Sequence, residues 1–235
     1  MKNLIIFGLF IIALVCAQFA QAQTVDDVIS KHIAALGGKE NLNKIQNVVM
    51  EGTLNIQGND IALTFTRVNK KLIRQDITAM GMNGFDMTTD KEGWKYLPFQ
   101  GMQKPEPKSE DEVKKAQNGL DIGGPFLDYV AKGNKVELQG KEDVEGAASH
   151  KLKVIFPSGK EIIYFINIAT GMINRTKETR KVNGEETELV TDYSDYKDVE
   201  GVKFPFTITQ QIGTVSISGI KVNQTIPDSA FKHDM

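Results

Sequence analysis

The fold is decided by residues 48–67, which read VVMEGTLNIQGNDIALTFTR. Apolar and polar side chains alternate on both sides of the turn Gly58-Asn59-Asp60, a pattern typical of two strands that each have one dry face and one wet face. Because only a short turn separates them, the two strands are expected to pair antiparallel as a hairpin. The same alternation continues along the chain in both directions.

Consecutive hairpins account for most of the remaining sequence. They predict a mainly β protein built on a single curled antiparallel sheet, an unclosed half-barrel of about 11–12 strands. Beyond the first hairpin, strands are predicted at residues 72–78, 85–88, 93–97, 135–140, 149–156, 161–168, 172–182, 185–196, 202–211 and 214–222.

Two helices stand out among the strands. Thr24 and Asp27 form a capping box at the start of a helix over residues 24–36, and Ser109 begins a second helix over residues 110–117. Segments 39–45 and 98–108 are interpreted as a turn and a loop, and residues 128–130 as a short helical turn. Two to three helices would therefore plug or cover the concave side of the sheet.

A sheet of this size encloses more space than its own side chains fill, so a helix, a ligand or both should occupy the interior. A two-sheet sandwich with a filled core is the alternative. Most inward positions would belong to the core in either architecture. They are apolar or aromatic: Met50, Leu54, Ile61, Leu63, Phe65, Phe85, Met87, Trp94, Tyr96, Phe204, Phe206 and Ile217.

Arg67 is the exception on this face, because it follows Ile61, Leu63 and Phe65 by strict alternation. A buried guanidinium without a partner is costly. Arg67 could bind the C-terminal carbonyls of a lid helix, meet a ligand head group, or reach water at the strand end.

The N-terminus has the pattern of a secretory signal peptide. Lys2 precedes an apolar run over residues 4–15, and Ala20-Gln21-Ala22 is a small-x-small cleavage site. We expect cleavage after Ala22 and a periplasmic chain of residues 23–235; a retained membrane anchor is the alternative, although the apolar run is short for one.

The cysteine count supports the same interpretation. The only cysteine, Cys16, lies within the signal and follows Val15, a poor context for lipid attachment. A mature chain without it has neither a disulfide nor a tether, and depends on its core alone for stability.

Catalytic and metal-binding patterns are absent from the sequence. It contains no HExxH, GxSxG or GxxxxGK[ST] motif, and its three histidines are scattered. The formal net charge of −2 does not favour nucleic acid as a partner. We therefore expect a protein that is not an enzyme and needs no metal or cofactor.

Four stretches resemble a known family. Residues 65–74 (FTRVNKKLIR) look like the strand-turn-strand of the LolA-type periplasmic lipoprotein carriers, and residues 89–98 (TDKEGWKYLP) resemble the hairpin that follows in that superfamily. Residues 193–206 (YSDYKDVEGVKFPF) and 226–231 (IPDSAF) resemble exported outer-membrane lipoprotein-sorting proteins. The resemblance covers most of the chain after the signal, although its motifs are short.

The resemblance implies that residues 23–235 form a LolA-like lipid-binding domain. In that family an unclosed β-barrel carries helices in its mouth as a lid, and lipids or the acyl chains of lipoproteins bind in its apolar hollow. Arg67 matches the arginine that ties the lid to the barrel, although Val68 stands where the family has proline. The implied ligand-binding residues are Met50, Leu54, Leu63, Phe65, Phe85, Met87, Trp94, Tyr96, Phe204, Phe206 and Ile217.

Three functions follow from these observations. The first is a soluble, monomeric periplasmic carrier that takes lipid or lipoprotein acyl chains from an inner-membrane donor toward an outer-membrane acceptor. The second is a non-enzymatic interaction or assembly module of the envelope with a packed β core. The third, a hydrolase with an unrecognised site, has the least support because no triad or metal ligands are present.

Overall fold

The computed structural model describes residues 23–56, 58–182 and 185–233. The predicted signal peptide, residues 1–22, lies outside the described residues. Within them the strands are β1 (Asn47–Ile56), β2 (Asn59–Val68), β3 (Leu72–Ala79), β4 (Met82–Thr89), β5 (Gly93–Tyr96), β6 (Glu106–Pro107), β7 (Lys135–Val144), β8 (Ala147–Ile155), β9 (Glu161–Asn167), β10 (Ile173–Val182), β11 (Glu185–Val199), β12 (Val202–Gln210) and β13 (Gly213–Val222).

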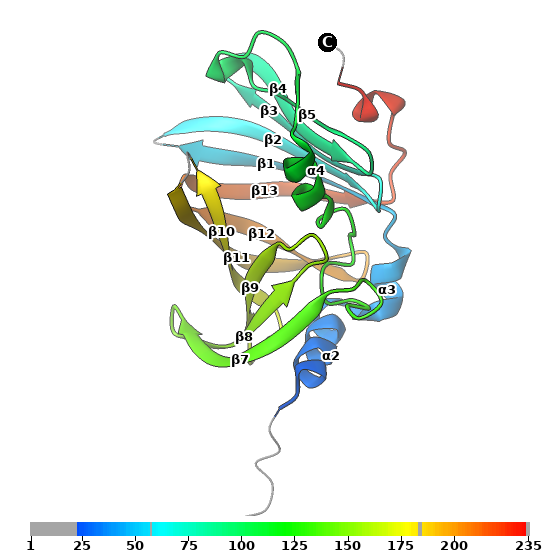
Figure 1. The fold of residues 1–235 in the computed structure, drawn as a ribbon, viewed down its shortest axis with the longest axis vertical. Coiled ribbons are helices and arrows are strands. Elements are labelled where there is room, and N and C mark those ends of the chain that lie inside the picture. The colour runs from blue at the N-terminus through cyan, green and yellow to red at the C-terminus, as the bar shows by residue number, and fades with distance from the viewer. Residues whose placement is uncertain (1–22, 57, 183–184, 234–235) are drawn as a thin grey trace, which may run out of the picture.

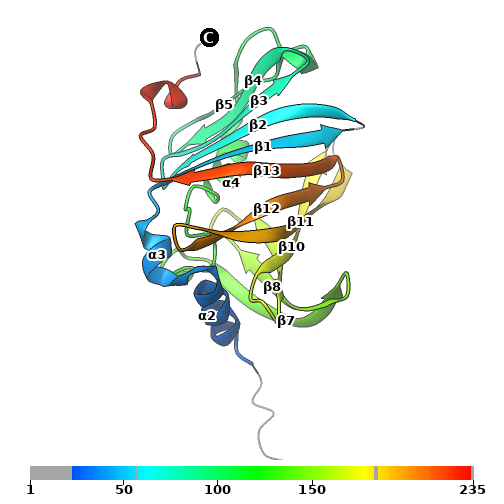
Figure 2. The same ribbon diagram turned by 180° about the vertical axis from the view of Figure 1, so that it is seen from behind.

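All these strands belong to one antiparallel sheet (Figures 1 and 2). The strand order is β6-β5-β4-β3-β2-β1-β13-β12-β11-β10-β9-β8-β7, so β6 and β7 are the two edges and the sheet is unclosed. The predicted fold class is confirmed, with 13 strands in place of about 11–12. The sandwich alternative is wrong, because the strands form one sheet.

The missed strand, β6, lies in the segment that the sequence presented as a loop. Its two residues extend the sheet at the edge, where Pro107 pairs with Trp94 and Glu106 with Lys95. Proline is tolerated at an edge because it cannot donate to a further strand.

The strand order forces one long connection across the sheet. Strands β6 and β7 are consecutive in sequence but lie at opposite edges, so residues 108–134 must pass over one face. This crossing segment contains α4 (Glu110–Gln117), which lies in front of the sheet in Figure 1 and behind it in Figure 2. We call the covered face concave and the other face convex.

Both predicted helices are confirmed. Helix α2 (Val25–Leu36) begins with the Thr24–Asp27 capping box, and α4 begins with the equivalent pair Ser109 and Glu112. Residues 128–133 form hydrogen-bonded turns and no helix. No helix of the described part of the chain is long and apolar enough to span a membrane.

The segment predicted as a turn at residues 39–45 is wrong, because a third helix, α3 (Gly38–Lys44), occupies it. Gly37, which separates α2 from α3, and Gly38, the first residue of α3, both have positive φ. A side chain at Gly37 would meet the carbonyl of Gly201 at 2.0 Å, so the close approach of β12 requires glycine here. Leu42 then buries α3 against the sheet.

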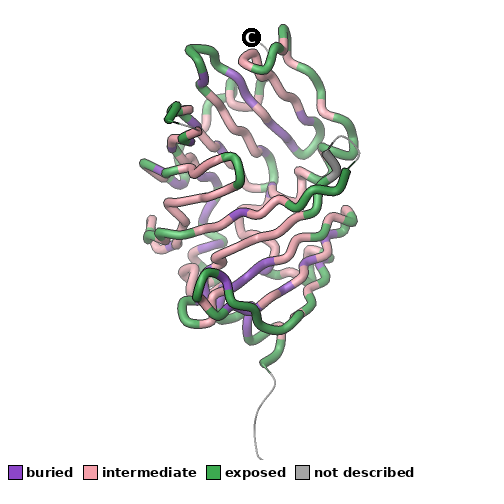
Figure 3. The backbone as a smooth tube through the Cα atoms, turned by 90° about the vertical axis from the view of Figure 1, so that its left-hand side faces the viewer, coloured by how far each residue is buried: buried purple, intermediate pink, exposed green. Residues whose placement is uncertain are grey.

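Three apolar clusters hold the molecule together. The first joins α2 and Phe126 to β8 and β9, and the second joins α3 and Leu127 to β1, β12 and β13. The third lies on β3 and β4, where the C-terminal 3-10 helix η2 (Asp228–Phe231) covers it. Buried positions are accordingly spread over the sheet, with many positions of intermediate burial among them (Figure 3).

Candidate functional site

Arg67 identifies which side chains face the crossing segment. Its Nη2 donates a hydrogen bond to the carbonyl of Gly119, just beyond α4, so Arg67 lies on the concave face. Residues that pair directly across an antiparallel ladder point to the same face. Arg67 pairs with Ile73, and two residues further along β2 Phe65 pairs with Gln75.

The register places five of the predicted ligand residues on this concave face. Met50 pairs with Phe65 on β2, while Leu63 lies opposite Gly52 and Leu54 opposite Ile61. Gly52 also pairs with Ile217 on β13 and leaves room for its side chain, since a Cβ at Gly52 would lie 3.0 Å from Ile217 Cδ1. The structure therefore brings together Met50, Leu54, Leu63, Phe65 and Ile217.

Four other predicted residues lie on the convex face. Phe85 pairs with Asp76 and Met87 with Arg74, and these two β3 residues point away from Ile73 and Gln75. Trp94 and Tyr96 pair with Met87 and Phe85 and share their face. The expectation that Phe85, Met87, Trp94 and Tyr96 line the same hollow as Leu63 and Phe65 is wrong.

The C-terminal segment seals this convex cluster. Leu72 and Met87 are 0% exposed beneath Ala230 and Phe231. Arg74 donates to the carbonyl of Lys232 at 2.8 Å and holds the segment in place. No accessible apolar surface remains there for a ligand at Leu72 or Met87.

The two predicted phenylalanines of β12 have different surroundings. Phe204, like Met50, packs against the cluster that contains Leu42, Val48 and Val222. The ring of Phe206 lies under the ammonium of Lys197, with Nζ 4.5 Å from the ring centroid.

The crossing segment is attached to both halves of the sheet. On one side Lys108 pairs with Asp86, and Gln117 Nε2 donates to the carbonyl of Thr89 at 3.2 Å. On the other side Asn118 Nδ2 donates to Ser158 Oγ, in the β8–β9 turn, at 2.6 Å. Polar contacts thus hold the part of this cover around α4, and the buried side chains of Phe126 and Leu127 hold the part that follows.

Under this cover the concave face keeps accessible apolar surface. Phe65, Met50 and Ile77 are only half-buried, as are Phe204 and Ile208, although all five lie on interior strands of the sheet. An interior apolar side chain that stays half-buried has not found a protein partner for its whole surface. The centre of the convex cluster is thus fully buried, whereas the concave face combines buried residues such as Leu63 with half-buried ones such as Phe65 and Ile77.

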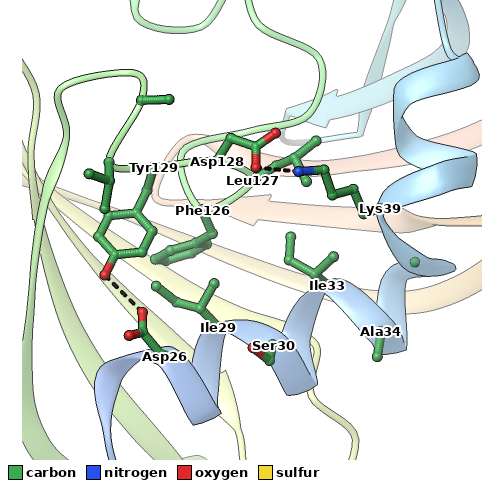
Figure 4. A pocket seen from close by; sticks show the side chains of 13 residues that line it. Asp26, Ile29, Ser30, Ile33, Ala34, Lys39, Phe126, Leu127, Asp128 and Tyr129 are labelled. Carbon is green, nitrogen blue, oxygen red and sulfur yellow. Dashed lines mark hydrogen bonds and ion pairs between the residues drawn. The ribbon is translucent and has the colours of Figure 1, made fainter.

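A cleft at the helical end opens between α2 and residues 126–131 (Figure 4). Its volume is about 760 Å³, within the range of small-molecule sites. Ile29 and Ile33 of α2 face Phe126 and Leu127 across it.

Two polar contacts span this cleft. Tyr129 donates to Asp26 at 2.9 Å, and Lys39 pairs with Asp128 at 2.5 Å. The sequence analysis missed this cleft, although the apolar stripe of α2 and the adjacent pair Phe126-Leu127 carried the signal.

Buried titratable groups cluster behind the crossing segment. Burial lowers the pKa of Arg67, and Asp121, Tyr193 and Tyr164 are close enough to oppose that shift. Burial also raises the pKa of Tyr164 and of Tyr193. Both tyrosines are therefore neutral at ordinary pH. Among residues 23–56, 58–182 and 185–233, no group of three or more His, Cys, Asp or Glu side chains could hold a metal ion.

Comparison with known proteins was made at the levels of sequence and structure. No family model matches the sequence, and no curated protein matches it. Solved structures do match. A LolA superfamily protein from Nitrosomonas europaea gives a TM-score of 0.54 at 13% identity, covering 87% of this chain and 96% of that chain. The chain has a LolA-like fold.

Two further structures share this LolA-like fold. A putative outer membrane lipoprotein-sorting protein domain from Vibrio parahaemolyticus gives a TM-score of 0.52 at 12% identity, covering 87% of this chain and 94% of that chain. A DUF1329 family protein from Desulfovibrio piger gives 0.50 at 13% identity, covering 89% and 97%. The likeness extends over nearly the whole described chain and concerns the fold.

Proposed function

We propose that this protein is a carrier that binds lipids or the acyl chains of lipoproteins on the concave face of its LolA-like sheet. One observation carries the proposal: Phe65, Met50 and Ile77 keep accessible apolar surface on the concave face, whereas Leu72 and Met87 at the centre of the convex cluster are fully buried. An acyl chain laid along this face would bury that surface without displacing packed core.

The energy of such binding is sufficient. Each buried methylene contributes about 0.8 kcal/mol, so a long acyl chain gains on the order of 10 kcal/mol before costs. Ordering the chain and moving the crossing segment reduce that gain. The remainder allows firm binding and still permits transfer to a partner with a tighter site.

The crossing segment would act as the lid. The part of this segment around α4 is attached by polar contacts, among them Arg67 with the Gly119 carbonyl and Asn118 with Ser158, whereas Phe126 and Leu127 anchor the rest in the apolar core. The polar contacts exchange readily for water once the part around α4 lifts, so entry of a chain does not require unfolding of the sheet.

The setting that we propose is the periplasm. The N-terminal signal pattern with cleavage after Ala22, together with a fold shared with lipoprotein-sorting proteins, supports export and transport toward the outer membrane. The carrier would work as a soluble monomer between an inner-membrane donor and an outer-membrane acceptor, and no bond would be made or broken.

Native mass spectrometry of the chain from residue 23, followed by solvent extraction, tests the proposal. We expect a co-purifying lipid, and uptake of a fluorescent fatty acid after delipidation. Phe65→Gln on the concave face should reduce uptake at least tenfold. Thr64→Gln is the matched control, because Thr64 is adjacent to Phe65 on β2 but points to the convex face.

Absence of bound lipid and of uptake in the folded protein would contradict the carrier. It would favour the alternative of an envelope interaction or assembly module with a packed β core. Equal loss of uptake in Phe65→Gln and Thr64→Gln would contradict the assignment of the concave face.

A further inference from the structure

Arg67 has more hydrogen-bonding capacity than its surroundings use. A guanidinium carries five N–H donors. Only Nη2 has a protein acceptor, the carbonyl of Gly119, and the fully buried Nε has none among the described residues. A buried donor without a partner costs about as much as a lost hydrogen bond, so a missing acceptor is indicated.

The charge of Arg67 is also left without a contacting anion. Asp121 is the acidic residue that raises the pKa of Arg67. Its carboxylate, however, pairs with Lys132 at 3.0 Å and accepts a hydrogen bond from the backbone N–H of Gly123 at 2.9 Å. Within the described part of the chain, Arg67 forms no ion pair. A buried cation without a contacting anion is costly, and an external anion bound beside it would offset that cost.

Two tyrosines add polar groups to the same place. Tyr164 of β9 and Tyr193 of β11 lie close enough to affect the pKa of Arg67, and both are neutral hydroxyl donors. Tyr193 has only a 3.5 Å contact with Thr176, and Tyr164 has no hydrogen bond within the described residues. Their hydroxyls remain available to a ligand.

Apolar surface extends from Arg67 along the concave face. Phe65, Leu63 and Ile61 follow it at two-residue steps on β2, and of these Phe65 and Ile61 are half-buried while Leu63 is buried. The row from Arg67 to Ile61 spans about 20 Å at the usual strand rise. That is comparable to an extended long acyl chain. A buried cation at one end of an apolar row is complementary to an amphiphile with an anionic end.

We propose that Arg67, with Tyr164 and Tyr193, binds the carboxylate or phosphate head group of a single-chain anionic amphiphile whose tail lies along Phe65, Leu63 and Ile61. This inference rests on the proposed carrier function and names its ligand class. The planar guanidinium can form two parallel hydrogen bonds to either anion. The head group would thus lie inside the molecule, beneath Gly119.

The competing explanation is that Arg67 only braces the crossing segment. Binding of palmitate, hexadecyl phosphate and the uncharged hexadecanol to the delipidated protein separates the two. Charge-assisted hydrogen bonds predict that one or both anions bind about tenfold to a hundredfold more tightly than hexadecanol. The anion whose affinity exceeds that of hexadecanol by the larger factor identifies the head group.

Substitution locates the preference. Arg67→Gln should lower anion affinity to the level of hexadecanol and leave hexadecanol binding within about twofold, since no charge interaction contributes to it. Arg74→Gln is the matched control, because Arg74 lies on the convex face of the next strand and should change no ratio. If Arg67→Gln does not fold, Tyr193→Phe provides the test instead. It keeps the ring and should reduce the preference for anions over hexadecanol severalfold.

Three results would overturn the inference. Equal binding of anions and hexadecanol would agree with the carrier function but contradict the head-group site at Arg67. Equal loss of all three probes in folded Arg67→Gln would assign Arg67 to bracing alone. Failure of every probe to bind the wild type would contradict the carrier function itself.

Discussion

The two faces of the β2–β5 region differ in how completely they are covered. On the convex face, Leu72 and Met87 are 0% exposed beneath the C-terminal segment. On the concave face of the same strands, Phe65 and Ile77 stay half-buried. One face stabilises the sheet, and the other holds apolar surface available to a ligand. The predictions below test this division, in order of their expected effect on stability.

Met87→Ala should have the largest effect on stability. Removing a fully buried methionine leaves a cavity and costs about 2–5 kcal/mol. The free energy of unfolding, measured by urea denaturation, should fall by that amount, while affinity for a fluorescent fatty acid stays unchanged in the folded protein. Loss of lipid uptake without loss of stability would reverse the roles assigned to the two faces.

Phe231→Ala should cost less, about 1–2 kcal/mol, because its ring is only partly buried on the convex cluster. The indole of Trp94 stacks on the imidazole of His233, with 3.8 Å between the ring centroids. Tryptophan fluorescence therefore reports whether the C-terminal segment stays in place. We expect a spectral shift together with a lower unfolding free energy. An unchanged spectrum with unchanged stability would show that the segment does not seal this face.

The sequence was sufficient to predict the concave face of β1 and β2. Their hairpin has strong alternation and a polar turn, so Met50, Leu63 and Phe65 were assigned to one face correctly. It was not sufficient for β4 and β5. Their apolar residues cover the convex face, and the segment that buries them is more than 100 residues away in sequence, a contact that no local pattern reveals.

One local signal could have corrected the error. The β3–β4 connection is a two-residue turn in which Met80 and Gly81 both have positive φ, as type I′ hairpins require. Such a turn places Phe85 opposite Asp76, on the face away from Ile77. The expected start of the strand at Phe85 hid this register. The position of the crossing segment likewise depends on strand order, which alternation does not encode.

Phe65→Ala should give the reverse of Met87→Ala. The ring of Phe65 is only partly buried, so its removal takes away less buried apolar area than Met87→Ala does. The loss of stability should therefore be about 1 kcal/mol. The lost contact should nevertheless weaken binding of a long-chain lipid at least fivefold, measured by fluorescence titration at matched folded concentration. A stability loss as large as that of Met87→Ala, with unchanged binding, would show that the concave face is ordinary core.

Acidification should loosen the helical end and leave both faces intact. His32 of α2 is buried and donates from Nδ1 to the carbonyl of Gly171 at 2.7 Å. Burial lowers its pKa below the ordinary 6.5, while the Gly171 bond opposes the shift only in part. The unfolded state therefore binds a proton first as the pH falls, and stability declines below about pH 6.5 until the pH passes the folded-state pKa.

Comparing wild type with His32→Asn measures this contribution, because asparagine can still donate to Gly171 but does not titrate. The melting temperature of the wild type should fall more than that of the variant between about pH 7 and about pH 5. His150, whose pKa burial also lowers, should supply the pH dependence that remains in the variant. If the melting temperatures of wild type and variant fell in parallel with pH, His32 would not be the group that makes the stability of the α2 end depend on pH.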